Sequence, residues 1–318
     1  MALAVVSFIW GTTYLASRIS ALQIPGLFVS GIRQFISGLI LVAYFKGRGF
    51  SWPDKVTFTK IFIQGILLLC VSNGLATWSV QYISSGLASI ISALVPLFIA
   101  LFSILFFKIT KFTLQIFFGT CIGFFGIAII FYDHFHQLFD ARFSFGIGLS
   151  LVATIAWALG SVYASNNKPT INILYSVGLQ MLVAGICMLI ICLVSGEYIN
   201  LFTADHNALL SLLYLIFFGS LITYSAYAFA ISKLPATQVS VYAYINPIVA
   251  IGLGGLLLNE KLSYNILLGT LVTLAGIYLV NKDFRKQRMH KTYIQEKLKQ
   301  GMFRALICYY EKQKRRFE

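Results

Sequence analysis

The chain has 318 residues, of which 58% are hydrophobic and only 11% are charged, and its mean hydropathy is +0.83. A composition this apolar leaves a water-soluble fold without enough polar side chains for its surface, so it excludes that class and predicts a polytopic membrane protein. The 24 Lys and Arg residues outnumber the 10 Asp and Glu residues, which gives a formal net charge of +14.

Ten apolar runs follow one another along the chain, each close to the ~20 residues that cross a bilayer as a helix. They cover about 2–20, 26–45, 60–80, 87–107, 113–131, 144–164, 172–193, 208–230, 236–258 and 264–281. Helices are predicted because backbone groups in lipid need partners within their own segment, and the alternation typical of barrel strands is missing. The first run has no basic leader and no convincing cleavage site, so we expect a retained helix.

The basic residues predict which way the helices run. If the N-terminus is cytoplasmic, 20 of the 24 Lys and Arg residues fall in cytoplasmic segments, and Arg18, Arg142 and Lys261 fall outside. This bias is the one that orients membrane proteins, and ten crossings return the C-terminus to the cytoplasm. Residues 282–318 hold twelve basic and four acidic side chains and are predicted to form a cytoplasmic tail.

Two interpretations of this tail remain open. It is attracted to anionic lipids of the cytoplasmic leaflet, with "GMFRALICYY" as a short amphipathic helix, or it is a solvated tail that also fixes topology. Nucleic-acid binding is the weaker reading of such a charge run on a membrane protein.

The second half of the chain repeats the first. The matching positions are Trp10 with Trp157, Gly31 with Gly178, Arg33 with Gln180, Gly38 with Gly185, Asn73 with Tyr224, Trp78 with Phe229, Pro96 with Pro247, Gly119 with Gly269 and Gly126 with Gly276. The chain is therefore predicted to be a duplicated five-helix unit, with repeats at 1–131 and 144–281. Because five is odd, the second copy enters the bilayer from the opposite side, which makes the copies inverted repeats of the kind that secondary transporters use.

Pro96 and Pro247 interrupt apolar runs at matching positions. A proline inside a helix removes a backbone hydrogen bond and leaves a carbonyl free, and in a membrane that carbonyl needs a partner or a cavity. We expect one kink per repeat beside a central pathway. A packing kink without substrate contact is the alternative.

Polar and aromatic residues near these prolines follow helical spacing. Ser85, Ser89, Ser92 and Pro96 share one side of their run, as Asn73 and Thr77 do of theirs. Uncharged polar and aromatic groups hold small organic solutes by stacking and hydrogen bonds. Any single hydroxyl can instead bond one helix to another. The candidate substrate-binding residues are Trp10, Tyr14, Asn73, Trp78, Ser89, Pro96, Trp157, Tyr224, Tyr227, Tyr242, Asn246 and Pro247.

Arg33 is the one charge well inside an apolar run, and no Asp or Glu in neighbouring runs offers it a partner. An intramembrane ion marks a functional position by default, so Arg33 is a candidate contact for an anionic group of the substrate. Its repeat mate Gln180 is neutral, which favours a structural role, and both readings remain open.

Groups for other chemistries are missing from the sequence. No predicted helix core holds Asp, Glu or His, so the usual proton relay and the usual anchor for a cationic drug are absent. The His134 and His136 pair in a loop is weak support for a metal site, and no phosphate-binding loop supports ATP-driven pumping. The five cysteines suggest no disulfide framework. We therefore expect no metal, no cofactor and no enzyme activity.

Four stretches resemble the EamA-type branch of the drug/metabolite transporter superfamily. They are "FIWGTTYLASRI", "GIRQFISGLIL", "ALVPLFIALFSILFF" and "AYINPIVAIGLGGLLLNEKLS", and the likeness covers about residues 1–281. The resemblance implies a ten-helix fold whose cavity is lined mainly by helices 1, 3, 4, 6, 8 and 9, moving metabolites such as amino acids, usually outward. One departure from the family pattern is that Lys108 and Ile109 stand opposite Asn259 and Glu260, which argues against a gate built from matching acids.

The sequence thus predicts a secondary transporter of small metabolites, most of all amino acids or related solutes, working by alternating access as an exporter or facilitator. The family likeness implies a bacterial inner membrane, and a monomer is the working hypothesis. A membrane-anchored interaction protein acting through its basic tail, without transport, is the alternative.

Overall fold

The computed structural model describes residues 2–106, 113–133, 136–258, 260, 263–283, 285–287 and 289. Helices are the only secondary structure in these residues. The elements are α1 (Ala2–Ala21), α2 (Gly26–Gly47), α3 (Lys55–Gln64), η1 (Gly65–Asn73), α4 (Gly74–Ser79), α5 (Ser85–Ser92), α6 (Val95–Leu105), α7 (Leu114–Asp133), η2 (His136–Phe139), α8 (Ala141–Asn166), α9 (Ile173–Ser195), η3 (Leu201–Thr203), α10 (His206–Tyr214), η4 (Leu215–Tyr224), α11 (Ser225–Lys233), α12 (Ala236–Val239), η5 (Ser240–Tyr244), α13 (Asn246–Leu258) and a last helix, Tyr264–Gln287.

The ten predicted spans correspond to these helices. Eight are long and apolar enough to cross a membrane, and Leu114–Ile130 and Asn246–Leu258 are shorter apolar helices. Several spans are composite: α3, η1 and α4 together form Lys55–Ser79, and α10, η4 and α11 form His206–Lys233. The last helix continues six residues past the predicted limit at 281, and residues 290–318 of the predicted tail lie outside the described residues.

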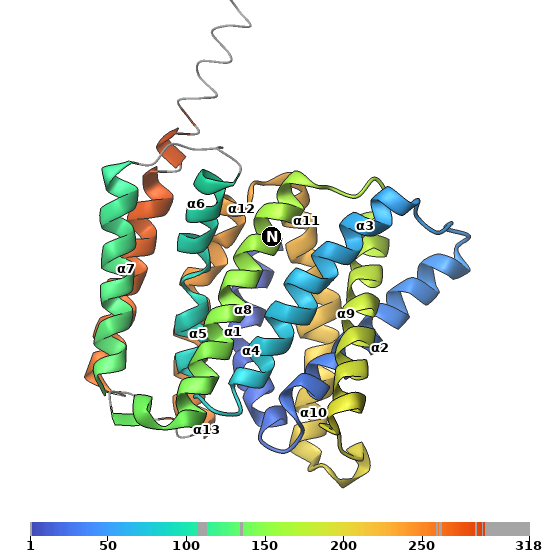
Figure 1. Ribbon diagram of the computed structural model, residues 1–318, viewed down its shortest axis with the longest axis horizontal. Helices are drawn as coiled ribbons and strands as arrows, with labels where there is room; N and C mark the ends of the chain where they lie inside the picture. The colour runs from blue at the N-terminus through green and yellow to red at the C-terminus, as the bar shows by residue number, and fades with distance from the viewer. Residues whose placement is uncertain are drawn as a thin grey trace, which may run out of the picture.

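Equivalent helices of the two halves run in opposite directions (Figure 1). In that view α1 descends while α8 ascends, α2 ascends while α9 descends, and α7 descends while the last helix ascends. The all-helical fold with two inverted five-helix repeats is therefore confirmed. The end of the molecule that carries the 48–54 loop is called the upper end below, and the end that carries the 22–25 loop is called the lower end.

Two seams of glycines join the repeats. In the α2–α9 seam, an added Cβ on Gly38 would lie 2.4 Å from the Leu182 nitrogen, and one on Gly185 would lie 2.4 Å from the Phe35 nitrogen. In the seam between α7 and the last helix, a Cβ on Gly126 would lie 2.6 Å from the Gly269 oxygen, and one on Gly269 would lie 2.5 Å from the Gly126 oxygen. Small residues let membrane helices approach this closely. The reciprocity of the contacts is what a two-fold relation between the repeats requires.

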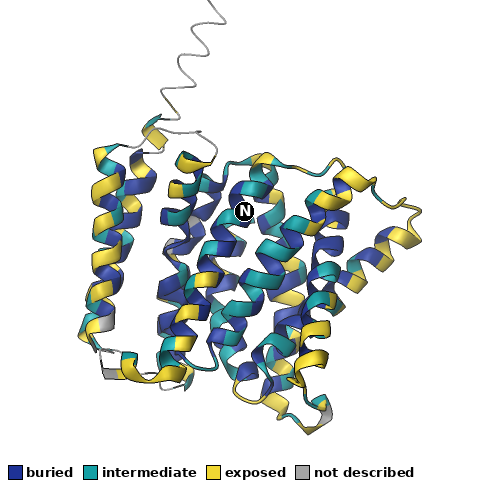
Figure 2. Cartoon of the chain, viewed as in Figure 1, coloured by how far each residue is buried: buried dark blue, intermediate teal, exposed yellow. Residues whose placement is uncertain are grey.

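The outer faces of the bundle are apolar. Figure 2 shows exposed residues along the outer sides of α7 and α9, among them Phe125, Leu193 and Val194, while the helices between the seams are mostly buried. Lipid tails solvate such side chains without cost, so this pattern fits a membrane-embedded body.

Candidate substrate cavity

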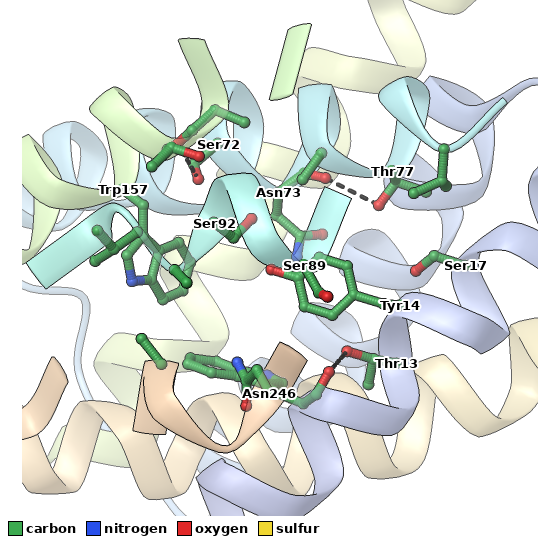
Figure 3. A pocket seen from close by; sticks show the side chains of 18 of the residues that line it. Thr13, Tyr14, Ser17, Ser72, Asn73, Thr77, Ser89, Ser92, Trp157 and Asn246 are labelled. Carbon is green, nitrogen blue, oxygen red and sulfur yellow. Dashed lines mark hydrogen bonds between the residues drawn. The ribbon is translucent and has the colours of Figure 1, made fainter. Parts of the chain in front are cut away.

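A cavity lies between the two seams and draws its wall from both repeats. The volume of the cavity is about 80 Å³. Figure 3 shows side chains from α1, η1, α4, α5, α8 and α13 converging on it. The wall residues are Trp10, Thr13, Tyr14, Ser17, Arg33, Ser72, Asn73, Ala76, Thr77, Val80, Ser89, Ser92, Ala93, Val95, Ala153, Thr154, Trp157, Tyr242, Ala243 and Asn246.

The structure brings most of the predicted site residues together. Those on the cavity wall are Trp10, Tyr14, Arg33, Asn73, Ser89, Trp157, Tyr242 and Asn246. Tyr224 and Tyr227 lie directly behind Trp157, with ring centroids 6.3 and 5.1 Å from its ring. Whether any of these side chains contacts a substrate stays a prediction.

Trp78, Pro96 and Pro247 are not among the wall residues. Trp78 packs edge-on against Phe145, with 5.4 Å between ring centroids. Pro96 is the second residue of α6, and Pro247 is the second residue of α13. Each proline therefore begins a new helical segment after a break, at a position where the missing N–H costs nothing. The break between α5 and α6 borders the cavity through Ala93, and η5, the segment before α13, borders it through Tyr242 and Ala243.

An aromatic layer closes the cavity on the side toward the upper end. The ring centroid of Trp10 lies 5.1 Å from each of Trp157, Tyr227 and Tyr242. The Tyr227 hydroxyl is 2.6 Å from the Ser161 Oγ, which holds the layer to α8. Four large rings from four helical segments fill the path, and so the layer separates the cavity from the upper end.

A second pocket lies on the other side of this layer. It is lined by Gln64, Leu68, Ala164, Lys168, Pro169, Ile171, Ile173, Ser176, Val177, Gln180, Tyr224, Tyr227, Ala228, Ile231 and Ser232. Lys168, Pro169 and Ser232 are near the ends of α8 and α11, so this upper pocket reaches the upper end of the molecule.

The upper pocket and the cavity are repeat-related. Asn73, Ala76 and Thr77 of the cavity correspond, at an offset of 151, to Tyr224, Tyr227 and Ala228 of the upper pocket. Arg33 and Gln180 form a further pair at an offset of 147. The two hollows thus occupy related positions in the two repeats, on opposite sides of the aromatic layer.

Two π-helical segments shape these walls, and sequence patterns did not predict them. η1 and η4 occupy nearly equivalent stretches of the two repeats, since Asn73 ends one and its mate Tyr224 ends the other. Backbone carbonyls of η4 accept side-chain hydrogen bonds: Trp10 Nε1 donates to Gly219 at 3.4 Å and Ser37 Oγ to Ile216 at 3.2 Å. π-Segments are frequent at functional sites, and here the last residue of η1, Asn73, lines the cavity, while the last residue of η4, Tyr224, lines the upper pocket.

Polar contacts also differ between the halves. In the lower half, the Asn73 Oδ1 accepts hydrogen bonds from Ser30 at 3.0 Å and Gln34 at 3.3 Å. In the upper half, Gln180 donates to Gln64 Oε1 at 2.8 Å and accepts from the Tyr224 hydroxyl at 2.5 Å. Sequence reasoning had noted Gln180 only as the mate of Arg33 and had missed Gln64, although two glutamines in apolar helices were a signal for a buried pair.

A cross-repeat tie lies at the lower end. The Glu260 carboxylate accepts hydrogen bonds from the Ser85 N–H at 2.9 Å, the Ser85 hydroxyl at 3.0 Å and the Gly86 N–H at 3.2 Å. It therefore satisfies the free N–H groups at the start of α5, where the helix dipole favours an anion. Nearby, the Arg18 guanidinium donates to the Val80 carbonyl. The tie joins the end of α13 to the start of α5 below the cavity.

Inverted helical repeats around a polar cavity are an architecture found in many membrane transporters. The sequence profile of the EamA-like transporter family matches residues 1–132 and 144–282. The chain belongs to this family and is an integral membrane transporter.

Relatives support the same family. The chain is 34% identical over 263 residues to the uncharacterized inner membrane transporter YedA of Escherichia coli strain K12, covering 82% of this chain and 83% of YedA. It is 27% identical over 305 residues to the uncharacterized transporter YvbV of Bacillus subtilis strain 168, covering 94% of this chain and 96% of YvbV. A protein of known crystal structure shares the fold with a TM-score of 0.64 at 15% identity, covering 90% of this chain and 96% of that chain.

Proposed function

We propose that the protein is a secondary transporter that moves small metabolites, most of all amino acids or related solutes, by alternating access, as an exporter or facilitator. The observation that carries the proposal is the pair of repeat-related hollows on opposite sides of one aromatic layer. A shift of the layer and its helices would close one hollow while opening the other, which is what inverted repeats permit. The neutral, hydroxyl-rich and aromatic wall suits a small organic solute.

The proposed setting is a bacterial inner membrane with both termini in the cytoplasm. Lys46, Arg48, Lys55, Lys168 and Lys233 belong to the upper end, which supports a cytoplasmic upper end through the positive-inside bias. The cavity would then release solute to the outside and the upper pocket would take it from the cytoplasm. We also propose that the repeats span 1–131 and 144–281, that the tail binds anionic lipids, and that the protein is a monomer.

The test combines flux with accessibility in proteoliposomes. The full chain, with its five cysteines replaced by serine, receives a single cysteine through Ser89→Cys in the cavity or Ser176→Cys in the upper pocket. We expect a membrane-impermeant thiol reagent to reach the two positions from opposite faces, and a transported solute to change the two rates in opposite directions. Leu193→Cys, on the exposed outer face of α9, is the control. We expect neither labelling by the impermeant reagent nor any effect of the solute at this position.

Flux is measured with a panel of amino acids and other small metabolites, with and without a pH gradient. Absence of flux across the panel, together with labelling of both cysteines from one face, would refute the proposal. Removing residues 288–318, beyond the last helix, tests the alternative of an interaction protein acting through its tail: a transporter keeps its flux.

A further inference from the structure

Arg33 is a buried cation that has no acidic side chain as a partner among the described residues. Its side chain is 3% exposed and lies on the cavity wall. Its Nε donates to the Ser220 hydroxyl at 2.7 Å, and its guanidinium lies against η4, where a Cβ on Gly219 would be 3.1 Å from Nη2. Among the described residues it has no other hydrogen bond and no salt bridge, so the terminal nitrogens of the fork are left for another partner.

The wall around Arg33 supplies no counter-charge. Not one Asp or Glu occurs among the wall residues of the cavity, nor a second cation. A charge kept out of water without a partner is costly, and such residues in membrane proteins pair with each other, with backbone carbonyls or with cargo. The cavity without solute therefore carries one uncompensated positive charge.

Comparison with the repeat mate argues against a purely structural role. Gln180 fills the equivalent position, and its amide is fully used by Gln64, Ser176 and Tyr224. A neutral side chain is thus enough to tie this part of the helix to its neighbours. The tie to the neutral hydroxyl of Ser220 does not call for a full charge either.

A second donor faces the same space. The indole of Trp157 is on the cavity wall (Figure 3), its side chain is 9% exposed, and its Nε1 lies near the Tyr227 and Tyr242 hydroxyls without a hydrogen bond of good geometry. By contrast, wall hydroxyls such as Thr13 and Ser89 donate to carbonyls of their own helices. Among the wall residues, the group left most clearly without a partner is therefore the Arg33 guanidinium, a donor that fits an oxyanion; the unpaired acceptor Gln34 Oε1 is not among the wall residues.

We propose that Arg33 is the carboxylate receptor of the cavity and that the cargo is a small monocarboxylate, recognised by its carboxylate and not by an amino group. The planar guanidinium matches a carboxylate with two parallel hydrogen bonds. A plain carboxylate makes the filled cavity neutral, whereas an ammonium group restores the unpaired positive charge. This inference rests on the proposed function and narrows its substrate class, from amino acids and related solutes to monocarboxylates.

The experiment measures binding of three compounds with the same body to the purified full chain. They are 3-phenylpropionate (anion), L-phenylalanine (zwitterion) and 3-phenylpropylamine (cation), at pH 7. Quenching of the fluorescence of Trp10 and Trp157, both on the wall, reports occupancy. We expect the anion to bind at least as tightly as the zwitterion, and the cation not to bind at concentrations that saturate the anion site.

Arg33→Gln, which introduces the side chain of the repeat mate, should weaken binding of 3-phenylpropionate by about 10-fold to 100-fold, the usual worth of a charged hydrogen bond. Arg33→Lys should retain part of it, because the charge remains and the fork is lost. Arg142→Gln removes one arginine outside the cavity and should leave the affinity unchanged.

The inference is overturned if the wild type binds the amine as tightly as the acid, if neither carboxylate binds at millimolar concentration, or if Arg33→Gln keeps the wild-type affinity. If Arg33→Gln does not fold, two measurements still test the inference. One compares binding of the acid and the amine to the wild type, and the other measures binding of the acid to Arg33→Lys. Carboxylate binding without flux in proteoliposomes would remove the transport proposal and keep this one. Wild-type flux in the Arg33→Gln variant would remove the carboxylate inference and keep the transport proposal.

Discussion

Replacing Glu260 by glutamine is expected to favour opening of the lower end of the cavity. The carboxylate ties the end of α13 to the first turn of α5 through the Ser85 N–H, the Ser85 hydroxyl and the Gly86 N–H. Glutamine keeps one acceptor oxygen but loses the negative charge that faces the helix N-terminus. A charged hydrogen bond contributes about 1.5–3 kcal/mol, and because Glu260 is partly exposed we expect a loss of about 1–2 kcal/mol.

That loss corresponds to a change of about 5-fold to 30-fold in the ratio of open to closed molecules. The assay is the rate at which an impermeant thiol reagent, applied from the lower face, labels Ser89→Cys in the cysteine-free chain. We expect Glu260→Gln to raise the rate in that range. Glu197→Gln, which changes an exposed acid of the same end, should leave it unaltered. An unchanged or slower rate would refute the reasoning that this tie holds the lower end shut.

The remaining predictions concern packing, the site and pH. Gly126→Ala should lower the thermal unfolding midpoint in detergent by the equivalent of about 1–3 kcal/mol, because its Cβ would be 2.4 Å from Thr273 Oγ1, whereas Gly148→Ala, with open space at its Cβ, should not. Trp157→Ala should abolish flux while Trp78→Ala, off the cavity wall, should reduce stability more than flux; equal flux defects would contradict the assignment. Hydrogen bonds from Thr57 and Val56 hold the pKa of Asp54 below its ordinary value, so the N-cap of α3 contributes stability above about pH 4 that is lost as the pH falls through the lowered pKa. In unfolding curves between about pH 2 and 5, Asp54→Asn should remove that part of the pH dependence.

The spans and the repeat were predictable because they depend on quantities that a sequence displays directly. Run length and apolarity identify membrane helices, and the glycines of both seams recur at a constant offset. The resemblance to the family added helices 1, 3, 4, 6, 8 and 9 as the expected cavity helices. All of these except the eighth, His206–Lys233, line the cavity; the eighth lines only the upper pocket, and α2, which was not in the expected set, supplies Arg33.

Side-chain direction was harder to predict. Asn73, Ala76, Thr77 and Val80 follow helical spacing and line the cavity, so Trp78, one position past Thr77, is off that face. Its repeat mate Phe229 is 50% exposed and is not a wall residue of the upper pocket. The repeat alignment already placed this purely apolar side chain opposite Trp78, which was a signal that the position does not face a polar site. The prolines were expected inside helices because the apolar runs continue through them. Hydropathy does not register a break of two residues such as the one between α5 and α6, nor the wider turns of η1 and η4.

The glycine seams stand at opposite edges of the molecule, with the cavity between them (Figure 1). At the glycines of both seams backbone lies against backbone, so parting either seam would lose these close contacts. If the protein works by alternating access, as proposed, we expect the two seams to stay fixed and the helices between them to move. An exchange of access would be a tilt of the middle of the protein inside a rigid frame, with little change in the outline that the surrounding lipid has to accommodate.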